Sequence, residues 1–121
     1  AHTGTPSAQF YVPMFLDAAA NGRISLERVV GATATDPARI FGLATKGRIE
    51  VGMDADIAIA DLDREWTITD DAVLSRIGWT PYAGRTIRGA IDRTLVRGAV
   101  VYEHGTVTGA QGWGRQARPS R

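Results

Sequence analysis

The chain of 121 residues suits one domain or a piece of a larger one, and its apolar share of 44% is sufficient for a hydrophobic core. A net charge of +1 gives no electrostatic footprint for nucleic acid or an anionic membrane, and no apolar stretch is long enough to span a bilayer. The lack of cysteine excludes disulfides, thiolate nucleophiles and Cys-ligated zinc.

The first part of the chain carries helical patterns. Residues 1–9 contain glycine, proline and serine without a periodic apolar face, so we expect a loop there, and they lack the pattern of a secretory leader, which favours a cytoplasmic protein. A helix is predicted from Gln9 to Ala20, because apolar residues recur at helical spacing. Asn21-Gly22 is a typical C-terminal stop signal.

Two more helices are predicted before the pattern changes at Gly42. Ser25 is a capping residue for a helix that runs to about Ala32. Asp36 is predicted to cap the next helix, with Pro37 in its first turn and Gly42 at its end.

The remainder has the pattern of short strands punctuated by turn residues. The predicted strands are Arg48–Val51, Asp56–Leu62, Glu65–Ile68, Thr86–Val96, Ala99–Glu103 and a brief return at Thr106–Thr108. Arg97-Gly98 is a hairpin signal, and Asp70–Ile77 has the apolar spacing of a short helix. Because no strand lies between the helices, this order indicates one part of a larger fold.

Clusters of polar residues are interpreted as structural. The aspartates at 54, 56, 61 and 63 lack the spacing of a calcium loop, and aspartate is a routine turn residue. His104 is expected in a turn and His2 lies next to the chain start, and neither has an evident acidic partner. The three tryptophans are expected to pack or to line an interface.

Three segments resemble the C-terminal part of a cyclic amidohydrolase, in the group of dihydroorotases, allantoinases and hydantoinases. KGRIEVGMDADIAIADL at Lys46–Leu62 is similar to the stretch with which these chains leave the catalytic barrel and enter a small β-sandwich. ISLERVVGATATDPARIFGL resembles the last barrel-flanking helices, and WTPYAGRTIRGAIDRTLVRGAVVYEHG resembles the hairpin that closes the sandwich. Together they cover about Gly4 to Gly109, in the family's order.

The resemblance implies an α+β fragment: the last helices of a (β/α)₈ barrel followed by the C-terminal strands of a small β-sandwich. Residues 1–45 would hold the barrel helices and the loop after strand 8, residues 46–110 the sandwich portion with a short helix and hairpin, and residues 111–121 a flexible tail. Within the group, Thr80–Thr86 followed by Arg88-Gly89 is most similar to dihydroorotases and allantoinases.

The resemblance also implies a metal-dependent hydrolase that opens a small cyclic amide at its C–N bond. In the complete enzyme, zinc or another divalent metal activates water, held by an HxH pair, a lysine, further histidines and an aspartate that serves as the base. None of these ligands has a match in this chain, whose only histidines are His2 and His104. We therefore expect no catalytic residue, no bound metal and no activity in this chain alone.

The loop that follows strand 8 is the part of the active site expected here, because such barrels place their sites in the loops after the strands. The candidates for contact with the substrate are Gly4, Pro6, Ser7 and Gln9. Gly4 would permit close approach of the backbone, Pro6 would stiffen the loop, and Ser7 or Gln9 would offer a hydrogen bond.

The expected partner is the missing N-terminal barrel portion or a second copy of the chain. The apolar residues Phe10, Tyr11, Met14 and Phe15 would then lie against the barrel. The alternative function is a non-catalytic assembly or interaction piece that pairs with a separate barrel chain. A third hypothesis is an independent β-rich binding module.

Overall fold

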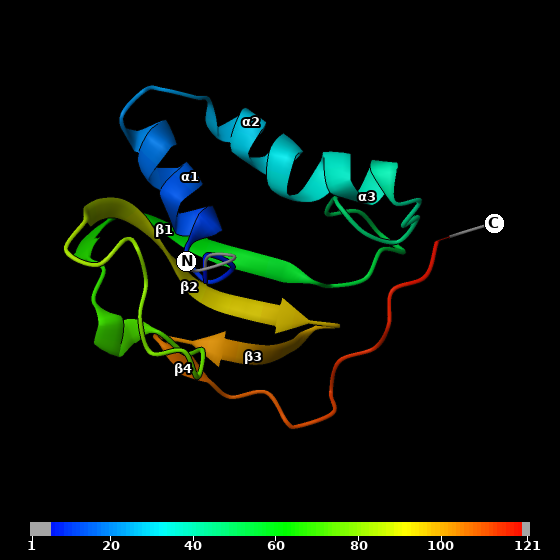
Figure 1. Cartoon of the computed structure of the whole chain (residues 1–121). Coiled ribbons are helices and arrows are strands. Elements are labelled where there is room, and N and C mark those ends of the chain that lie inside the picture. Colours follow the sequence, from blue (N-terminus) through cyan, green and yellow to red (C-terminus); the bar gives the residue numbers. More distant parts are fainter. Residues whose placement is uncertain (1–5, 120–121) are drawn as a thin grey trace.

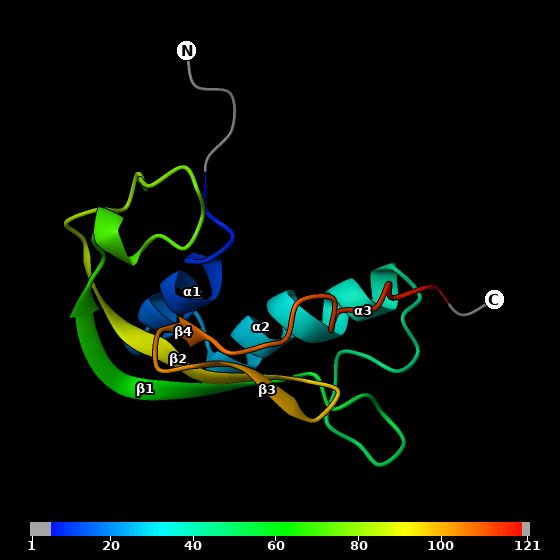
Figure 2. The same ribbon diagram turned by 90° about the horizontal axis from the view of Figure 1, so that it is seen from below.

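The structure, a computed structural model, describes residues 6–119, and in this range it combines three α-helices and two short π-helical and 3₁₀ segments with one antiparallel sheet. The elements are α1 (Tyr11–Ala20), α2 (Leu26–Val30), a π-helical segment (Gly31–Thr35), α3 (Asp36–Ile40), β1 (Ile57–Thr67), a 3₁₀ turn (Asp70–Ala72), β2 (Thr86–Val96), β3 (Ala99–Glu103) and β4 (Thr106–Val107). The strands follow one another in the order β1-β2-β3-β4 (Figure 1). After β4 the C-terminal segment runs back to the end of α3 (Figures 1 and 2).

Helix α1 begins and ends on local backbone contacts. The carbonyl of Ser7 accepts hydrogen bonds from the amides of Phe10 (3.0 Å) and Tyr11 (3.1 Å), so the helix begins two residues later than predicted. At its end, Gly22 has φ +68° and its amide donates to the carbonyl of Ala19. The predicted stop signal is confirmed, because the left-handed backbone at Gly22 suits glycine best.

The second and third helices are continuous, and only one of the two predicted caps is present. The Ser25 hydroxyl accepts from the Arg28 amide at 3.2 Å, as predicted. The predicted cap at Asp36 is wrong, because its backbone is helical (φ −66°, ψ −45°). The π-helical segment ends just before α3, in which Pro37 has no amide hydrogen to donate to the preceding turn. The chain nevertheless stays helical through this proline. The Asp36 carboxylate instead contacts Arg28 (3.3 Å) and Arg39 (3.4 Å).

Strand β1 joins the two strands that were predicted at 56–62 and 65–68. Its register with β2 changes from Asp61 opposite Ala90 to Glu65 opposite Arg88, so β1 carries extra residues at that point. The Asp61 carboxylate accepts from the amides of Asp63 (3.0 Å) and Arg64 (3.1 Å). These bonds satisfy the backbone within the irregularity and let the strand continue.

Two predicted elements are wrong. Residues 48–51 form no strand, because none of the described strands pairs with them, and the side chains of Ile49 and Val51 are 84% and 102% exposed. The predicted helix at 70–77 is reduced to the 3₁₀ turn, since Val73 is already extended (φ −76°, ψ 113°). Val73, one of the apolar residues whose spacing predicted that helix, packs against the core instead.

The core lies between α1 and the sheet. Phe10, Ile68 and Ile87 are fully buried, and Met14, Trp66, Val73 and Tyr82 pack around them. Phe10 is thus part of this chain's own core and Met14 packs against that core, whereas the sequence placed both residues against a barrel. Tyr11 and Phe15, on the other side of α1, remain exposed and contact each other edge to face at 6.5 Å.

Gly89 sets how closely α1 approaches β2. It has φ +106°, and a Cβ atom there would lie 2.6 Å from the Cβ of Leu16. The buried carboxylate of Asp17 accepts from the Arg88 amide at 3.1 Å and lies 3.4 Å from the Arg85 guanidinium. Helix α1 is therefore held on β2 by the close contact of Leu16 with Gly89, where a side chain would not fit, and by the buried carboxylate of Asp17.

The helices keep apolar surface on their outer side. Ile40 and Phe41, at the end of α3, are 69% and 65% exposed, and Leu26 and Val30 of α2 are exposed as well. The helices are therefore not fully enclosed by the rest of the described chain. Exposed apolar groups in such number mark contact surfaces.

Candidate functional site

The loop with the predicted substrate contacts leads directly into α1. Gly4 lies outside the described residues, while Pro6 and Ser7 are half-buried and Gln9 is exposed. Ser7 uses its backbone carbonyl to start the helix. The substrate role of these residues stays a prediction, and the structure adds the contacts that hold them.

The side chain of Gln9 bridges the loop to a segment more than sixty positions away in the sequence. Its Nε2 atom donates to the carbonyl of Ala72 at 2.7 Å, and its Oε1 atom accepts from the amide of Leu74 at 2.9 Å. Both halves of the amide are therefore occupied within the chain. Local patterns could not indicate this, because the partners are backbone groups of a distant segment.

The segment that contacts Gln9 is itself held to the core. Asp70 accepts from the amide of the buried residue Thr80 at 2.9 Å. Tyr82 then packs edge to face against Phe10, with ring centroids 6.3 Å apart. Residues 70–82 thus close back onto the start of α1.

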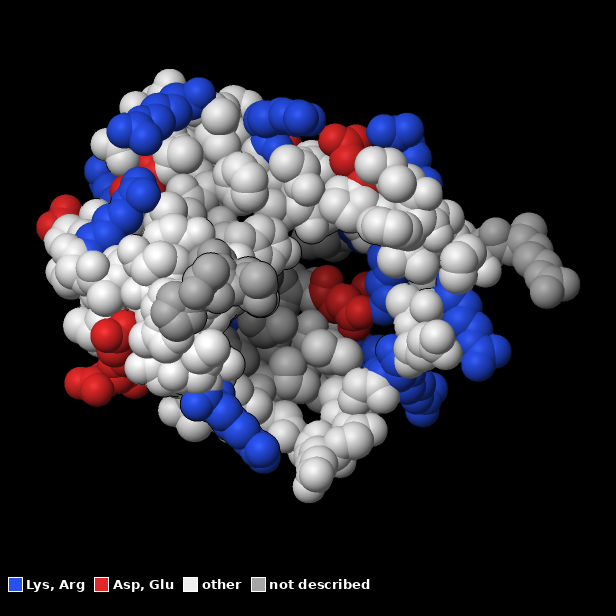
Figure 3. All heavy atoms as spheres, in the orientation of Figure 1, with Lys and Arg blue, Asp and Glu red and all other residues white. Residues whose placement is uncertain are grey.

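A hollow of about 980 Å³ opens beside this loop, between the start of α1, the segment around Leu74 and the strands β2, β3 and β4. Its wall is mostly apolar and includes Phe10, Trp66, Leu74 and Val101. Figure 3 shows a hollow on one face of the molecule. The size suits a ligand pocket, and the ionisable side chains in its mostly apolar lining are Arg64, Asp71 and Tyr102.

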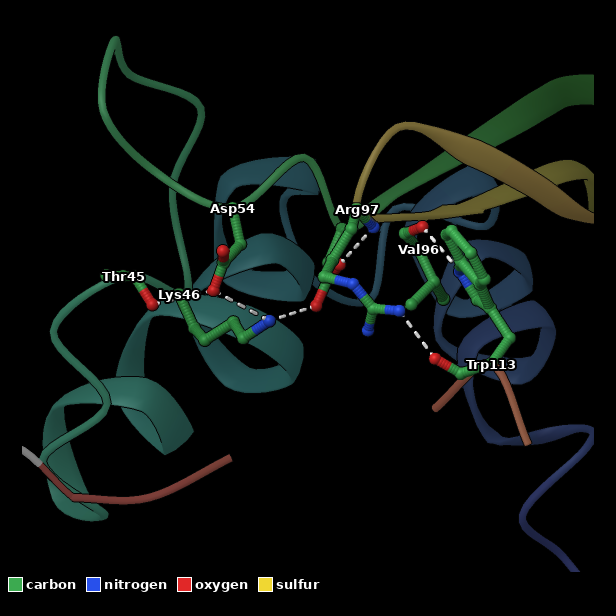
Figure 4. Close-up of polar contacts among 7 residues, drawn as sticks. Thr45, Lys46, Asp54, Val96, Arg97 and Trp113 are labelled. Carbon is green, nitrogen blue, oxygen red and sulfur yellow. Dashed lines mark hydrogen bonds and ion pairs between the residues drawn. The ribbon is translucent and has the colours of Figure 1, made fainter. Parts of the chain in front are cut away.

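A polar cluster forms where the helices pass into the sheet (Figure 4). The Lys46 ammonium lies 3.0 Å from Asp54 and also donates to Asp56. Thr45 donates to Asp54 at 2.7 Å, and the Arg97 amide donates to Asp56 at 2.7 Å. The two aspartates thus join the helical part to the β2–β3 turn, in agreement with their structural interpretation.

The pKa values in this cluster follow from its hydrogen bonds. The bond to Asp56 raises the pKa of Lys46, and the bond from Thr45, followed by that from Lys46, lowers the pKa of Asp54. Burial acts to raise the pKa of Asp56, but the bonds from Lys46 and the Arg97 amide outweigh it and leave this pKa below its ordinary value. The cluster is therefore fully charged at neutral pH.

Trp113 holds the C-terminal segment against the β2–β3 turn. Its indole nitrogen donates to the carbonyl of Val96 at 3.0 Å, and the Arg97 guanidinium lies 4.6 Å from its ring centroid. The Arg97 side chain also donates to the Trp113 carbonyl at 2.5 Å, as Figure 4 shows. Trp66 likewise packs, with its indole nitrogen bonded to the carbonyl of Gly89. These two tryptophans have the packing role predicted for them.

His104 has a partner that the sequence did not reveal. Its Nδ1 atom lies 2.7 Å from an Asp92 carboxylate oxygen, and its amide donates to the Asp92 carbonyl at 3.0 Å. No partner of His104 is evident from the sequence, because Asp92 faces it as the extra residue of β2 where the register of β2 with β1 shifts. His2 lies outside the described residues.

Asp17 is a second residue that sequence reasoning missed. A signal was present, because it is the only charged residue in the apolar helix YVPMFLDAAA. Buried carboxylates require partners, so its position pointed to an anchor on the sheet.

The metal implied by the family resemblance does not fit the residues that the structure describes. Across 6–119, no group of three or more histidine, aspartate or glutamate side chains is placed to hold a metal ion. His104 is engaged with Asp92, and the carboxylates of Asp54 and Asp56 face Lys46. In the same range no helix has the length and apolar character to cross a bilayer.

Comparison with known proteins gives relatives for nearly the whole chain. The dihydroorotase of Pyrococcus furiosus is 42% identical over 106 residues, which are 88% of this chain and 25% of the relative. The allantoinase of Rubrobacter xylanophilus is 38% identical over 119 residues, 98% of this chain and 26% of the relative. The chain therefore spans about a quarter of the length of the relatives that it matches.

The fold has counterparts among solved structures. L-hydantoinase (dihydropyrimidinase) from Arthrobacter aurescens superposes with a TM-score of 0.81 and 41% identity, over 85% of this chain and 23% of that chain. A D-hydantoinase gives a TM-score of 0.82 at 33% identity, over 89% and 24%. The amidohydrolase family model matches residues 17–102, which is well over half of the sequence. This match takes in α2, α3, the Lys46 cluster and the β2–β3 hairpin described above, and the chain belongs to the amidohydrolase family.

Proposed function

We propose that this chain is the C-terminal segment of a hydrolase that opens a cyclic amide. The observation that carries the proposal is the similarity of 88–98% of the chain to proteins named dihydroorotase and allantoinase. In the proposed reaction, water adds to the ring carbonyl carbon, the C–N bond breaks, and the ring nitrogen takes up a proton. A carboxylate and a free amine or amide nitrogen result.

The proposed share of this chain in that reaction is structural support and one substrate loop. The metal, commonly zinc, and its ligands would belong to the rest of the enzyme, as a (β/α)₈ barrel whose last helices are α1, α2 and α3. The exposed apolar residues on the helices, such as Tyr11, Ile40 and Phe41, support a contact with such a barrel. The cytoplasm remains the predicted location.

A second candidate is a non-catalytic assembly piece that pairs with a separate barrel chain. The same exposed helix surface favours it, because the surface needs a partner whether or not that partner lies on the same polypeptide. The two candidates differ in whether addition of this segment restores turnover to a barrel.

A hybrid enzyme tests the main proposal. This chain would replace the aligned quarter of the Pyrococcus furiosus dihydroorotase, and the truncated dihydroorotase without it would serve as the control. We expect the hybrid, and not the truncated control, to open dihydroorotate, allantoin or a hydantoin. A folded, metal-loaded hybrid that opens none of these rings would contradict the proposal.

The chain by itself should neither bind stoichiometric zinc nor turn over any of the three rings. Metal analysis of freshly purified protein and an assay at high protein concentration check this expectation. Tight zinc at an equimolar level would show that ligands exist within this chain and would sink the assignment of the metal to the rest of the enzyme.

A further inference from the structure

The candidate substrate loop contacts segment 72–74 through the side chain of Gln9. Gln9 accepts from the Leu74 amide and donates to the Ala72 carbonyl, at 2.9 Å and 2.7 Å. These are the two backbone groups that flank Val73, which is extended. A neighbouring parallel strand would engage the same pair of groups through the N–H and C=O of one of its residues, so the Gln9 side-chain amide takes the place of such a residue.

Val73 is held from its other side as well. Its side chain packs against the buried core of Phe10, Ile68 and Ile87. Phe10 follows Gln9 directly and is 1% exposed. The bridge through Gln9 and the packing of Val73 therefore fix the segment 72–74 relative to the start of α1 at two independent points.

The same contacts restrict the candidate substrate loop. Residues 7–10 are fixed by the Ser7 carbonyl, the Gln9 amide and the Phe10 ring. Ala8, Gln9, Ala72 and Leu74 also line one wall of the hollow. A displacement of segment 72–74 would therefore move the loop and reshape that wall together.

We infer that Gln9 is a positioning residue for the proposed reaction: its amide clamps the substrate loop onto segment 72–74, and it does not itself bind the substrate. The inference rests on the proposed function and assigns Gln9 a different role within the same loop. The clamp uses one N–H and one oxygen lone pair of the amide and fixes its orientation toward segment 72–74, which leaves only the second N–H and the second lone pair for any other partner. If the Gln9 amide were removed, water could hydrogen-bond to the exposed peptide groups of Ala72 and Leu74 at a modest cost in free energy. The substitution should therefore change the position of the loop more than the stability of the fold.

Three variants separate the roles of the amide. Gln9→Met removes both hydrogen bonds at nearly constant length, Gln9→Glu keeps the oxygen that accepts from Leu74 but sets its second oxygen against the Ala72 carbonyl, and Gln111→Met is the matched control. Gln111 is an exposed glutamine in the C-terminal segment, remote from the loop in sequence. The variants are compared as the chain itself and in the hybrid with the Pyrococcus furiosus dihydroorotase.

Amide exchange and steady-state kinetics give the two readouts. In the chain itself, Gln9→Met should speed exchange of the Leu74 amide about fivefold, the effect of one net hydrogen bond, Gln9→Glu should speed it less, and Gln111→Met should leave it protected. In the hybrid, Gln9→Met should raise KM severalfold with little change in kcat, and Gln9→Glu should raise KM less. This order would not be expected if the Gln9 amide nitrogen bound the ring, because both variants lack that nitrogen.

Two results would overturn the inference. One is unchanged Leu74 exchange in Gln9→Met, which would show that no clamp exists. The other is a rise in KM in Gln9→Glu as large as in Gln9→Met although the Leu74 amide is better protected in Gln9→Glu, which would place the Gln9 amide nitrogen on the substrate. An inactive parent hybrid counts against the proposed function, whereas the exchange of Leu74 judges the clamp without any turnover.

Discussion

At the scale of single residues, the fold depends on a few close contacts that leave no room for a larger side chain. Gly89 combines a positive φ with direct contact to Leu16, so the side chain that it lacks would occupy the interface between α1 and β2. Asp17 supplies the buried polar contact a short distance away. Both residues act on the same helix–strand interface and set its spacing.

Replacement of Gly89 tests that spacing. Gly89→Ala should lower the free energy of unfolding by roughly 2–4 kcal/mol, because backbone strain and overlap with Leu16 add. Gly84→Ala is the matched control: Gly84 also has a positive φ, +83°, but open space around its Cβ position. It should cost only about 1–2 kcal/mol. Thermal unfolding followed by circular dichroism measures both, and equal losses would mean that α1 shifts away freely.

Lys46 controls the response of the fold to pH. The lowered pKa values of Asp54 and Asp56 give stability that is present above the unfolded-state pKa, about 3.9, and is lost as pH falls through the folded values. The raised pKa of Lys46 gives stability that is complete below about pH 10.4 and is lost as pH rises through its folded value. The cluster therefore stabilises the fold across the neutral range.

Lys46→Met should lower the melting temperature at neutral pH and should flatten its decline toward both pH extremes, because the cation that shifts both aspartates is gone. Arg48→Met is the control, since the ion pair of Arg48 with Glu50 is largely exposed at both ends and exposed pairs contribute little. Melting curves at acid, neutral and alkaline pH check this. Parallel pH profiles for Lys46→Met and the parent chain would contradict the assignment.

At the scale of elements, segment 70–82 replaces a predicted helix with a loop held by side chains. Asp70 accepts from the Thr80 amide, and the Thr80 residue is buried. A buried amide without a partner loses its hydration and gains nothing in return. The loop thus depends on one carboxylate in the way that a helix depends on its cap.

Asp70→Ala should therefore destabilise the chain by about 1–3 kcal/mol, the usual result of leaving a buried donor unpaired. Asp71→Ala is the neighbouring control, because Asp71 is exposed and lies in the same 3₁₀ turn. Chemical denaturation of the two variants gives the comparison. Similar midpoints for both would show that water replaces the carboxylate at Thr80.

The sequence predicted the elements whose signals are local. β2 and β3 have the predicted bounds, because the two-residue turn Arg97-Gly98 fixes the hairpin, and the Ser25 cap is present. It failed where the deciding partner is distant or absent. Segment 48–51 was predicted as a strand, but no described strand pairs with it. Asp36 was predicted as a helix cap, but its backbone is itself helical.

The same reason separates what could be predicted of the site. The predicted position of the candidate substrate loop rests on family resemblance, since nothing in Pro6–Gln9 is diagnostic in chemical terms. The partners of Gln9 and of His104 could not be predicted, because they depend on the folding of 72–74 and on the extra residue Asp92 in β2. Such contacts need the tertiary structure.

At the scale of the whole molecule, the chain combines a small core with a large exposed apolar surface. Few side chains are fully buried, while Ile40, Phe41, Ile49 and Val51 lie open. In a solution of the purified chain, this surface has only other copies of the chain or solvent to contact. Self-association is the physical consequence.

We expect the purified chain to associate in a concentration-dependent manner. The double variant Ile40→Glu/Phe41→Glu should shift it toward the monomer, because charges on the exposed end of α3 disfavour apolar contact. Val107→Glu is the control, since Val107 is also exposed but lies on β4, away from the helices. Light scattering over a range of concentrations measures the shift. A single monomeric species for the parent chain at every concentration would argue against a contact surface on the helices.

The return of the C-terminal segment to the helices has a practical consequence. A Cβ atom built at Gly42 would lie 3.6 Å from the Cβ of Pro119, within the span of a disulfide. The chain has no cysteine of its own, so a pair introduced at these positions could oxidise only with each other or between molecules. Gly42→Cys/Pro119→Cys should thus form a covalent ring from most of the polypeptide, visible as faster migration in a non-reducing gel. Such a cross-link would fasten the final residues beside α3 for labelling or immobilisation without touching the hollow.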